Sequence, residues 1–139
     1  MSTGGSETSL AVVEEVFRWF NNLGARKISL NRSDLDQHFT TDVTMTINEK
    51  VMCKGVDAMF QRFVEMLDKT ESWHVAVPFE TGLSEADLAA ASYQYRFVDA
   101  RKSRGTAHVI AIWRVRGGKI SGIQEMAHFE EQELVLHQY

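Results

Sequence analysis

The feature that most limits the fold is a series of strand-like stretches that fills the chain from residue 72 onward. Apolar and polar side chains alternate there over residues 72–81, 87–99, 103–116 and 119–129, which is the two-residue period of β-strands. The last two stretches are joined by Arg116-Gly-Gly-Lys119, and two glycines suit the positive φ angles of a tight hairpin. Residues 83–87 and 100–103 supply two further turns, so the sequence predicts a four-stranded antiparallel meander.

The first half of the chain has helical periods instead. A helix is predicted to begin at Ser9 and to end at Gly24, because two apolar stripes follow the 3.6-residue period. The stripes consist of Leu10, Val13, Phe17 and Phe20, and of Val12, Val16, Trp19 and Leu23. A helix that is apolar on more than half its circumference has to be covered on two sides, as it is when it lies across the mouth of a curved sheet.

Three more elements precede the meander. Ser33 is read as the N-cap of a short helix that continues through Phe39. Residues 40–48 alternate like a half-buried strand, and a third helix is predicted to start at Lys54-Gly55. A chain with helices first and strands last is of the α+β class, with its helices on one face of the sheet. We expect residues 1–8 to be a disordered tail and residues 9–139 to be a single domain, since 139 residues suit one core.

Composition and charge exclude several classes of partner. The apolar residues are spread along the chain and form no run of membrane-spanning length, so the sequence predicts a water-soluble protein that does not bind membranes. A net charge of −4 argues against a nucleic-acid partner, because such binding relies on clustered Lys and Arg. Cys53 is the only cysteine and the N-terminus does not resemble a signal peptide, which favours the cytoplasm. We read Cys53 as a small core residue.

Four short segments resemble one known superfamily. They are Ser33-Asp-Leu-Asp, Phe39-Thr-Thr-Asp-Val43, Lys54-Gly-Val-Asp-Ala-Met-Phe60 and Val115-Arg-Gly-Gly-Lys-Ile120. In this order, and with the order of the predicted elements, they resemble the nuclear transport factor 2-like (NTF2-like) superfamily and particularly its SnoaL-like branch. The resemblance covers nearly the whole chain. It implies a cone-shaped half-barrel, a bent antiparallel sheet wrapped on three N-terminal helices, whose interior is an active site, a ligand cavity or a packed core.

The resemblance alone does not choose among the activities of the superfamily. Its members include polyketide cyclases, ketosteroid isomerases, dehydratases, epoxide hydrolases and modules with no known chemistry. The isomerase pattern requires a base where this chain has Ile47, and oxyanion partners where it has Val16 or Phe17 and Ala111. We therefore reject steroid isomerisation as the default function.

Two other patterns match in part. The dehydratase pattern has a histidine at the position of His74, but Val98 and Ile47 stand where further polar residues belong. The epoxide hydrolase pattern has an acid at the position of Glu125 and an asparagine close to Asn48. Its Arg-x-Asp motif is absent, since Arg96 and Asp99 are three residues apart. Neither pattern is complete.

Glu125 and His74 are the candidate proton carriers. Strand alternation places Glu125 on the same face as Ile123 and Ala127, and a carboxyl group among apolar neighbours has a raised pKa that suits acid–base work. His74 alternates with Trp73 and Val75, and imidazole titrates near neutral pH. For both residues the alternative is a structural role, as a hydrogen-bonded or surface side chain. No thiol pair or histidine spacing indicates a metal site, and the chemistry needs no cofactor.

Aromatic residues are predicted to form the wall of a ligand pocket for a small apolar molecule. We assign this role to Phe17, Phe20, Tyr93, Tyr95 and Trp113, and Tyr95 could also donate a hydrogen bond to a ligand oxygen. Packing explains these residues equally well.

Two hypotheses follow for the function. The first is an acid–base lyase, isomerase or cyclase that acts on a small apolar, oxygen-bearing molecule. The second is a binding or dimerisation module without chemistry. We also expect a homodimer, because the meander carries apolar residues such as Ile110, Ile112 and Trp113 on both faces, more than three helices can cover.

Overall fold

The computed structural model describes residues 7–130, which form three helices and a seven-stranded sheet. In chain order the elements are α1 (Ser9–Gly24), α2 (Arg32–His38), β1 (Phe39–Ile47), β2 (Lys50–Lys54), α3 (Val56–Lys69), β3 (Thr70–His74), β4 (Thr81–Glu85), β5 (Leu88–Asp99), β6 (Arg104–Arg116) and β7 (Lys119–Phe129). Most of the predicted tail, and residues 131–139 of the predicted domain, lie outside the described residues.

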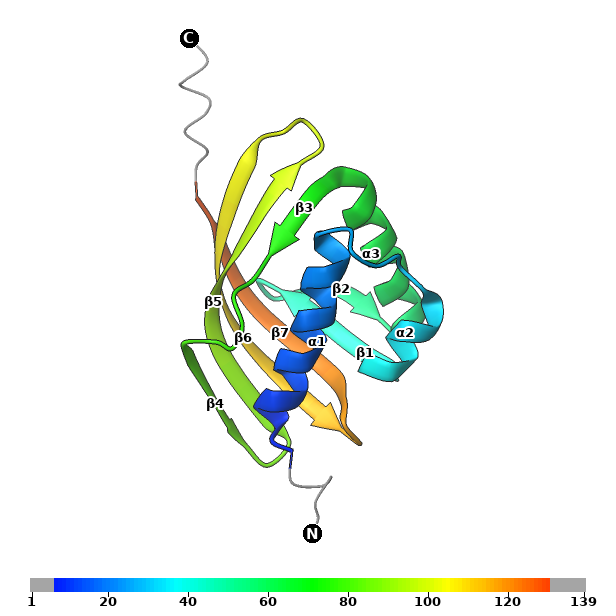
Figure 1. The fold of residues 1–139 in the computed structure, drawn as a ribbon. Coiled ribbons are helices and arrows are strands. Elements are labelled where there is room, and N and C mark those ends of the chain that lie inside the picture. Colours follow the sequence, from blue (N-terminus) through cyan, green and yellow to red (C-terminus); the bar gives the residue numbers. More distant parts are fainter. Residues whose placement is uncertain (1–6, 131–139) are drawn as a thin grey trace.

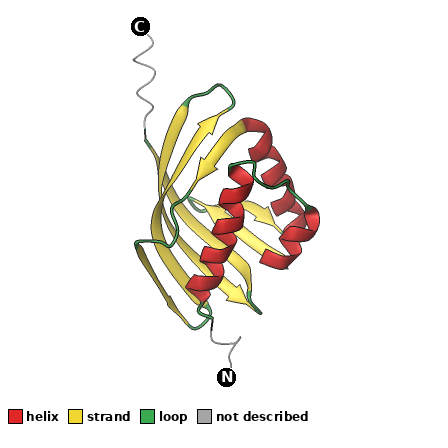
Figure 2. Ribbon diagram, viewed as in Figure 1, coloured by secondary structure: helices red, strands yellow, loops and turns green. Residues whose placement is uncertain are grey.

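The sheet curls around the helices and leaves its other face uncovered (Figures 1 and 2). The strand order is β2-β1-β7-β6-β5-β3, and β4 pairs with β5 beyond the end of β3. The α+β half-barrel is thus confirmed. One pairing differs from the antiparallel sheet that we predicted, because β1 runs parallel to β7. This parallel contact joins the first strand of the chain to the last, and it closes the sheet around the helices.

The first helix is positioned by its cap and by its two apolar stripes. The Thr8 side chain accepts a hydrogen bond from the Ala11 amide, which satisfies one of the free N–H groups of the first turn. Val13 and Leu23 are fully buried. On another side of α1, Trp19 and Phe20 contact Phe63 of α3. At its C-terminus the indole of Trp73 donates a hydrogen bond to the Phe20 carbonyl at 2.8 Å, and this contact holds α1 to β3.

The glycine hairpin forms where the sequence predicts it. Gly117 and Gly118 have φ angles of 60° and 77°, values that favour glycine over residues with a Cβ atom. The turn pairs Arg116 with Lys119 and fixes the antiparallel register of β6 and β7. That register decides which side chains of β7 face the helices.

Three details correct the sequence-based prediction. Strand β2 was not predicted; it pairs with β1 through a register that shifts between Met45 and Thr46. The predicted strand 72–81 is interrupted after His74, so β3 and β4 are separate, and residues 83–85 belong to β4 rather than to a turn. The cap of α2 is Asn31 rather than Ser33, because the Asn31 side chain accepts the Ser33 amide.

Cys53 is buried, as predicted for a small core residue. Its thiol contacts the Ala58 carbonyl at 3.8 Å, and burial raises the pKa of this thiol. A raised pKa lowers the fraction of reactive thiolate, so the structure gives Cys53 no feature of a nucleophile. None of the helices within residues 7–130 has the length and apolar character that crossing a membrane requires.

Candidate functional site

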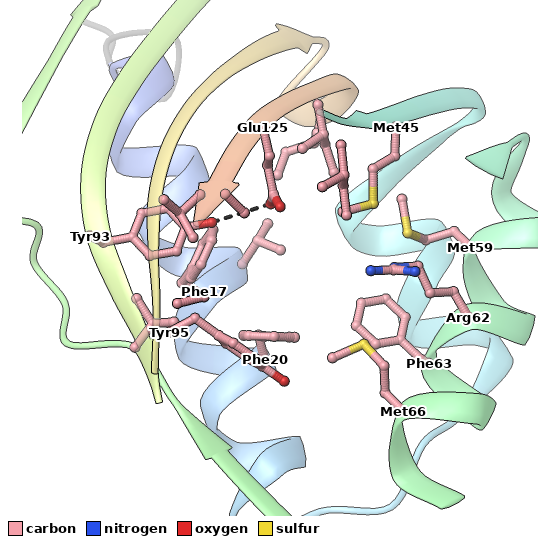
Figure 3. A pocket seen from close by; sticks show the side chains of 18 of the residues that line it. Phe17, Phe20, Met45, Met59, Arg62, Phe63, Met66, Tyr93, Tyr95 and Glu125 are labelled. Atoms are coloured by element: carbon pink, nitrogen blue, oxygen red, sulfur yellow. Dashed lines mark hydrogen bonds between the residues drawn. The ribbon is translucent and has the colours of Figure 1, made fainter. Parts of the chain in front are cut away.

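A cavity of about 330 Å³ lies between the curved sheet and the helices. Its walls come from α1, from α3 and from the inner face of β1, β5, β6 and β7, and Figure 3 shows side chains from these elements converging on it. The lining is mostly aliphatic and aromatic, and includes Met45, Met59, Met66, Val109 and Ile123. A cavity of this size and polarity suits a small, largely apolar molecule.

The five residues predicted to form an aromatic wall all line this cavity: Phe17, Phe20, Tyr93, Tyr95 and Trp113. They also contact one another. The Phe17 ring lies edge-on to the Tyr93 and Trp113 rings, with centroid distances of 5.3 Å and 5.7 Å. Edge-on packing is a favoured geometry for aromatic pairs. Their role in ligand binding stays a prediction.

Glu125 extends into the cavity from β7. Alternation along the strand turns it inward together with Ile123 and Ala127, which also line the cavity. Its cross-strand neighbours are Ile47 on β1 and Ala111 on β6, so both flanks of the carboxyl group are apolar. The Tyr93 hydroxyl donates a hydrogen bond to Glu125 Oε2 at 3.2 Å (Figure 3). This is the one hydrogen bond to the Glu125 side chain that residues 7–130 provide.

This environment changes the proton affinity of the cavity groups. Burial raises the pKa of Glu125, and the Tyr93 hydrogen bond and the positive charge of Arg62 oppose that rise. Burial also raises the pKa of both tyrosines, with a further contribution from the negative charge of Glu125. Both phenols therefore remain neutral hydrogen-bond donors at physiological pH. Glu125 is then the acidic group of the cavity whose raised pKa suits proton exchange with a ligand.

Arg62 is a cavity residue that the sequence analysis missed. It lies on α3, and its guanidinium extends into the cavity opposite Glu125 (Figure 3). The sequence did contain a signal for it. Arg62 stands three residues after Met59 and four before Met66, so it shares the inward apolar stripe of a helix whose other charges face outward. A charged residue within the apolar stripe of a helix is unusual, and this could have identified Arg62 as a candidate site residue.

Comparison with known proteins agrees with this fold. The family model of the SnoaL-like domain matches residues 16–123. The chain belongs to the SnoaL-like family. No curated protein sequence matches it, but many solved structures share its fold.

Three of these structures show how widely the fold is shared. An NTF2-like protein from Anabaena variabilis has a TM-score of 0.69 at 18% identity, over 95% of this chain and 96% of that one. An LEH-like epoxide hydrolase from M. tuberculosis has a TM-score of 0.68 at 12% identity, over 88% and 85%. A putative SnoaL-like polyketide cyclase from Jannaschia sp. has a TM-score of 0.66 at 11% identity, over 91% of each chain. Identities this low show the fold alone.

His74 lies outside the cavity of this SnoaL-like protein. Trp73 and Val75 are buried on the inner side, so the residue between them faces out. His74 is exposed on the uncovered face of the sheet, where β3 pairs it with Arg96. The structure therefore does not bring His74 and Glu125 together, because the sheet separates them.

The remaining residues of the epoxide hydrolase pattern are also not assembled. The Asn48 side chain accepts the Ala127 amide at 2.9 Å and donates to the Ala127 carbonyl at 3.1 Å. It thus joins the end of β1 to β7 and has a structural role. Arg96 donates to Gln94 on the outer face. No group of three or more His, Cys, Asp or Glu side chains within residues 7–130 has the arrangement of a metal site.

The raised pKa of Glu125 gives a prediction for stability. Burial raises the pKa of Glu125 above its value in the unfolded chain, so the folded protein binds this proton more tightly. Proton binding therefore stabilises the fold in acid, and this contribution is lost as the pH rises through the pKa of the folded state. Glu125→Gln cannot ionise and still accepts the Tyr93 hydrogen bond. We expect its thermal midpoint to exceed the parent's at neutral pH, and the difference to shrink as the pH falls through the folded pKa of Glu125. A midpoint several degrees below the parent's, with normal titration of Glu125, would assign this residue a structural role.

Proposed function

We propose that this SnoaL-like protein binds a small apolar carbonyl compound in the cavity and that Glu125 transfers a proton at the carbon next to the carbonyl. The observation that carries the proposal is a single carboxyl group of raised pKa in an apolar cavity, hydrogen-bonded on one oxygen only within the described residues. A general base needs a pKa that approaches the working pH and an oxygen that can reach the substrate. The upward shift of the Glu125 pKa supports the first requirement, and its Oε1, which has no hydrogen bond to the described residues, supports the second.

The proposed step needs no cofactor. Glu125 carboxylate takes the proton from the α-carbon, the electron pair of the broken C–H bond forms a carbon–carbon double bond, and the π pair of the carbonyl moves to its oxygen to form an enolate. The neutral Tyr95 hydroxyl lines the same cavity and would donate a hydrogen bond to that oxygen. In a substrate with a β,γ double bond the enolate is a dienolate, and return of the proton to its γ-carbon isomerises the substrate. Attack of the enolate on a second carbonyl closes a ring, and the proton then goes to the new alkoxide.

The similarity to a putative SnoaL-like polyketide cyclase supports this class of chemistry, because ring closure through an enolate begins with the same proton abstraction. The similarity to an LEH-like epoxide hydrolase supports the hydrolase alternative less well, since Asn48 is held by β7.

Deuterium exchange tests the proposal without knowledge of the natural substrate. 2-Tetralone is an apolar bicyclic ketone whose α-protons can be followed by NMR in deuterated buffer. We expect the protein to accelerate their exchange above the buffer rate. If 2-tetralone binds in the cavity and exchange is not accelerated, the binding-module hypothesis replaces the catalytic one.

We also propose that the protein is a homodimer of cytoplasmic location. The outer sheet face carries an apolar patch, defined by Leu83, Ile110, Ile112 and Met126, each more than 40% exposed. Its residues come from β4, β6 and β7, and Ala90 of β5 pairs with both Leu83 and Ile112. The helices leave this face open (Figure 2). In a dimer with a two-fold axis, this apolar patch would pack against the same patch of the second copy.

Sedimentation velocity tests the dimer. We expect the parent to sediment as a dimer at tens of micromolar, and Ile110→Asp to shift it toward monomer because an unpaired charge would be buried at the interface. Val51→Asp is the matched control, since Val51 is an exposed apolar strand residue on β2, away from the patch. A monomeric parent at these concentrations would contradict the proposal.

A further inference from the structure

The polar groups of the cavity are divided between its two sides. The helical side consists of eight lining residues from α1 and α3: Val16, Phe17, Trp19, Phe20, Met59, Arg62, Phe63 and Met66. Only Arg62 and Trp19 among them carry nitrogen donors, and none carries an oxygen acceptor. The carboxylate of Glu125 belongs to the opposite, sheet side. The helical side is therefore complementary to a group that accepts hydrogen bonds.

Neither donor of the helical side has a partner within residues 7–130. The Trp19 indole N–H is buried without a hydrogen bond. Arg62 lines the cavity and makes no hydrogen bond or ion pair with the described residues. By contrast, Arg26 donates to three backbone carbonyls, and Arg32 pairs with Asp36 and Asp57. Placing an unpaired charge in an apolar cavity costs free energy unless a ligand or solvent compensates it.

Glu125 does not compensate Arg62 directly. The two side chains enter the cavity from opposite walls, α3 and β7 (Figure 3), and Glu125 Oε2 is bonded to Tyr93 instead. Phe20, Tyr95 and Met59 line the same cavity, and in Figure 3 the Phe20 and Tyr95 rings lie on its α1 and β5 side, away from Arg62. A molecule that spans this space would meet a cation at one end, apolar side chains along its length and the carboxyl–phenol pair at the other end.

We propose that Arg62 anchors an anionic oxygen group of the ligand, so that the ligand is a small apolar acid whose carbonyl end faces Glu125. This inference rests on one part of the proposed function, namely that a ligand binds in the cavity. A guanidinium has five donors in a planar fork that fits a carboxylate bidentately. Apolar side chains around the guanidinium would strengthen that contact, because charges attract more strongly in a medium of low dielectric constant. Arg62 thereby fixes which end of the ligand reaches Glu125, and it selects acids over neutral molecules of the same shape.

The anchor also couples ligand binding to the protonation of Glu125. A bound anion repels a second negative charge in the cavity, so it favours the protonated form of Glu125. The other titratable side chains that line the cavity are Arg62 from α3 and the two neutral tyrosines of β5; α1, β1 and β6 contribute none. The affinity for an anionic ligand should thus fall as the pH rises through the Glu125 titration, and Glu125→Gln should remove that fall.

Two probes of nearly equal shape test the proposal: 2-naphthoate, which is anionic, and 2-naphthamide, which is neutral. Isothermal titration calorimetry measures both affinities. We expect the parent to bind naphthoate more tightly, and Arg62→Met to weaken naphthoate binding by about tenfold or more while naphthamide binding persists. Arg62→Lys keeps the charge and should retain most of the preference. Arg101→Met removes the same charge from an exposed hairpin and should change neither affinity.

The outcomes separate this inference from the proposed function. If the parent binds naphthamide as tightly as naphthoate, or if Arg62→Met leaves the preference intact, Arg62 is not an anion anchor, although the cavity still binds small molecules. If neither probe binds, the cavity does not accept ligands of this size, and the proposed function fails together with the inference. Thermal unfolding of Arg62→Met and Arg62→Lys shows that each variant is folded before its affinity is compared.

Discussion

Glu125→Gln is expected to slow the exchange of 2-tetralone α-protons by about 10²–10⁴-fold, the range that a positioned general base contributes. Glutamine has the shape of glutamate and keeps an acceptor for the Tyr93 hydroxyl, so the cavity should keep its form. What it loses is the ability to take a proton. NMR measurement of deuterium incorporation, with the buffer rate subtracted, gives the size of the loss.

The pH dependence of the same reaction identifies the base. A general base works when ionised, so the exchange rate should rise with pH and level off above the pKa of Glu125. Because burial raises this pKa, the rise should be centred above the ordinary range for a glutamate. The variant should show no such rise, since Tyr93 and Tyr95 are the other acidic side chains among the described residues that line the cavity, and the pKa of both is raised further from neutrality.

Glu65→Gln is the matched control for this experiment. Glu65 is an exposed residue of α3 that does not line the cavity, so the same chemical change there should leave the exchange rate at the parent level. The catalytic assignment would be contradicted if Glu125→Gln exchanged 2-tetralone as fast as the parent. The same variant should gain stability at neutral pH, because catalytic groups are often held in environments that destabilise their charged form.

The sequence predicted those parts of the fold that short segments specify. The glycine pair at 117 and 118 determines its hairpin locally, through φ angles that other residues disfavour. Alternation grouped Glu125 with Ile123 and Ala127 on one face of β7, and all three residues line the cavity. A period of two assigns a strand its two faces without any knowledge of its partners.

What the sequence could not supply was contact between distant segments. The parallel pairing of β1 with β7 joins residues about 80 positions apart, and no local pattern encodes it. Alternation showed that His74 and Trp73 face opposite ways, but not which of them faces the helices. That choice follows from the packing of Trp73 against α1, through its bond to the Phe20 carbonyl. Arg62 was missed because the helical period of α3 was judged from its apolar residues alone, and the arginine between them was not considered.

Trp113→Ala is expected to destabilise the fold by about 3–5 kcal/mol, the usual cost of removing a large buried aromatic side chain. Trp113 is 1% exposed. It stacks on Phe79 with ring centroids 5.7 Å apart and meets the edge of Phe17 at 5.7 Å, so it joins β6 to α1 and to the segment before β4. The loss corresponds to a fall of roughly 10–20 °C in thermal midpoint for a chain of this length.

Urea unfolding of three variants measures this contribution. Arg114→Ala changes the next residue of β6, which is exposed on the opposite face, and should alter stability by no more than about 0.5 kcal/mol. Trp113→Phe keeps an aromatic ring and should lose less than the alanine variant. Because Trp113 lines the cavity, water can enter the space that its removal opens, which favours the lower end of the expected range. A loss below about 1 kcal/mol would show that this wall of the cavity is not part of the core.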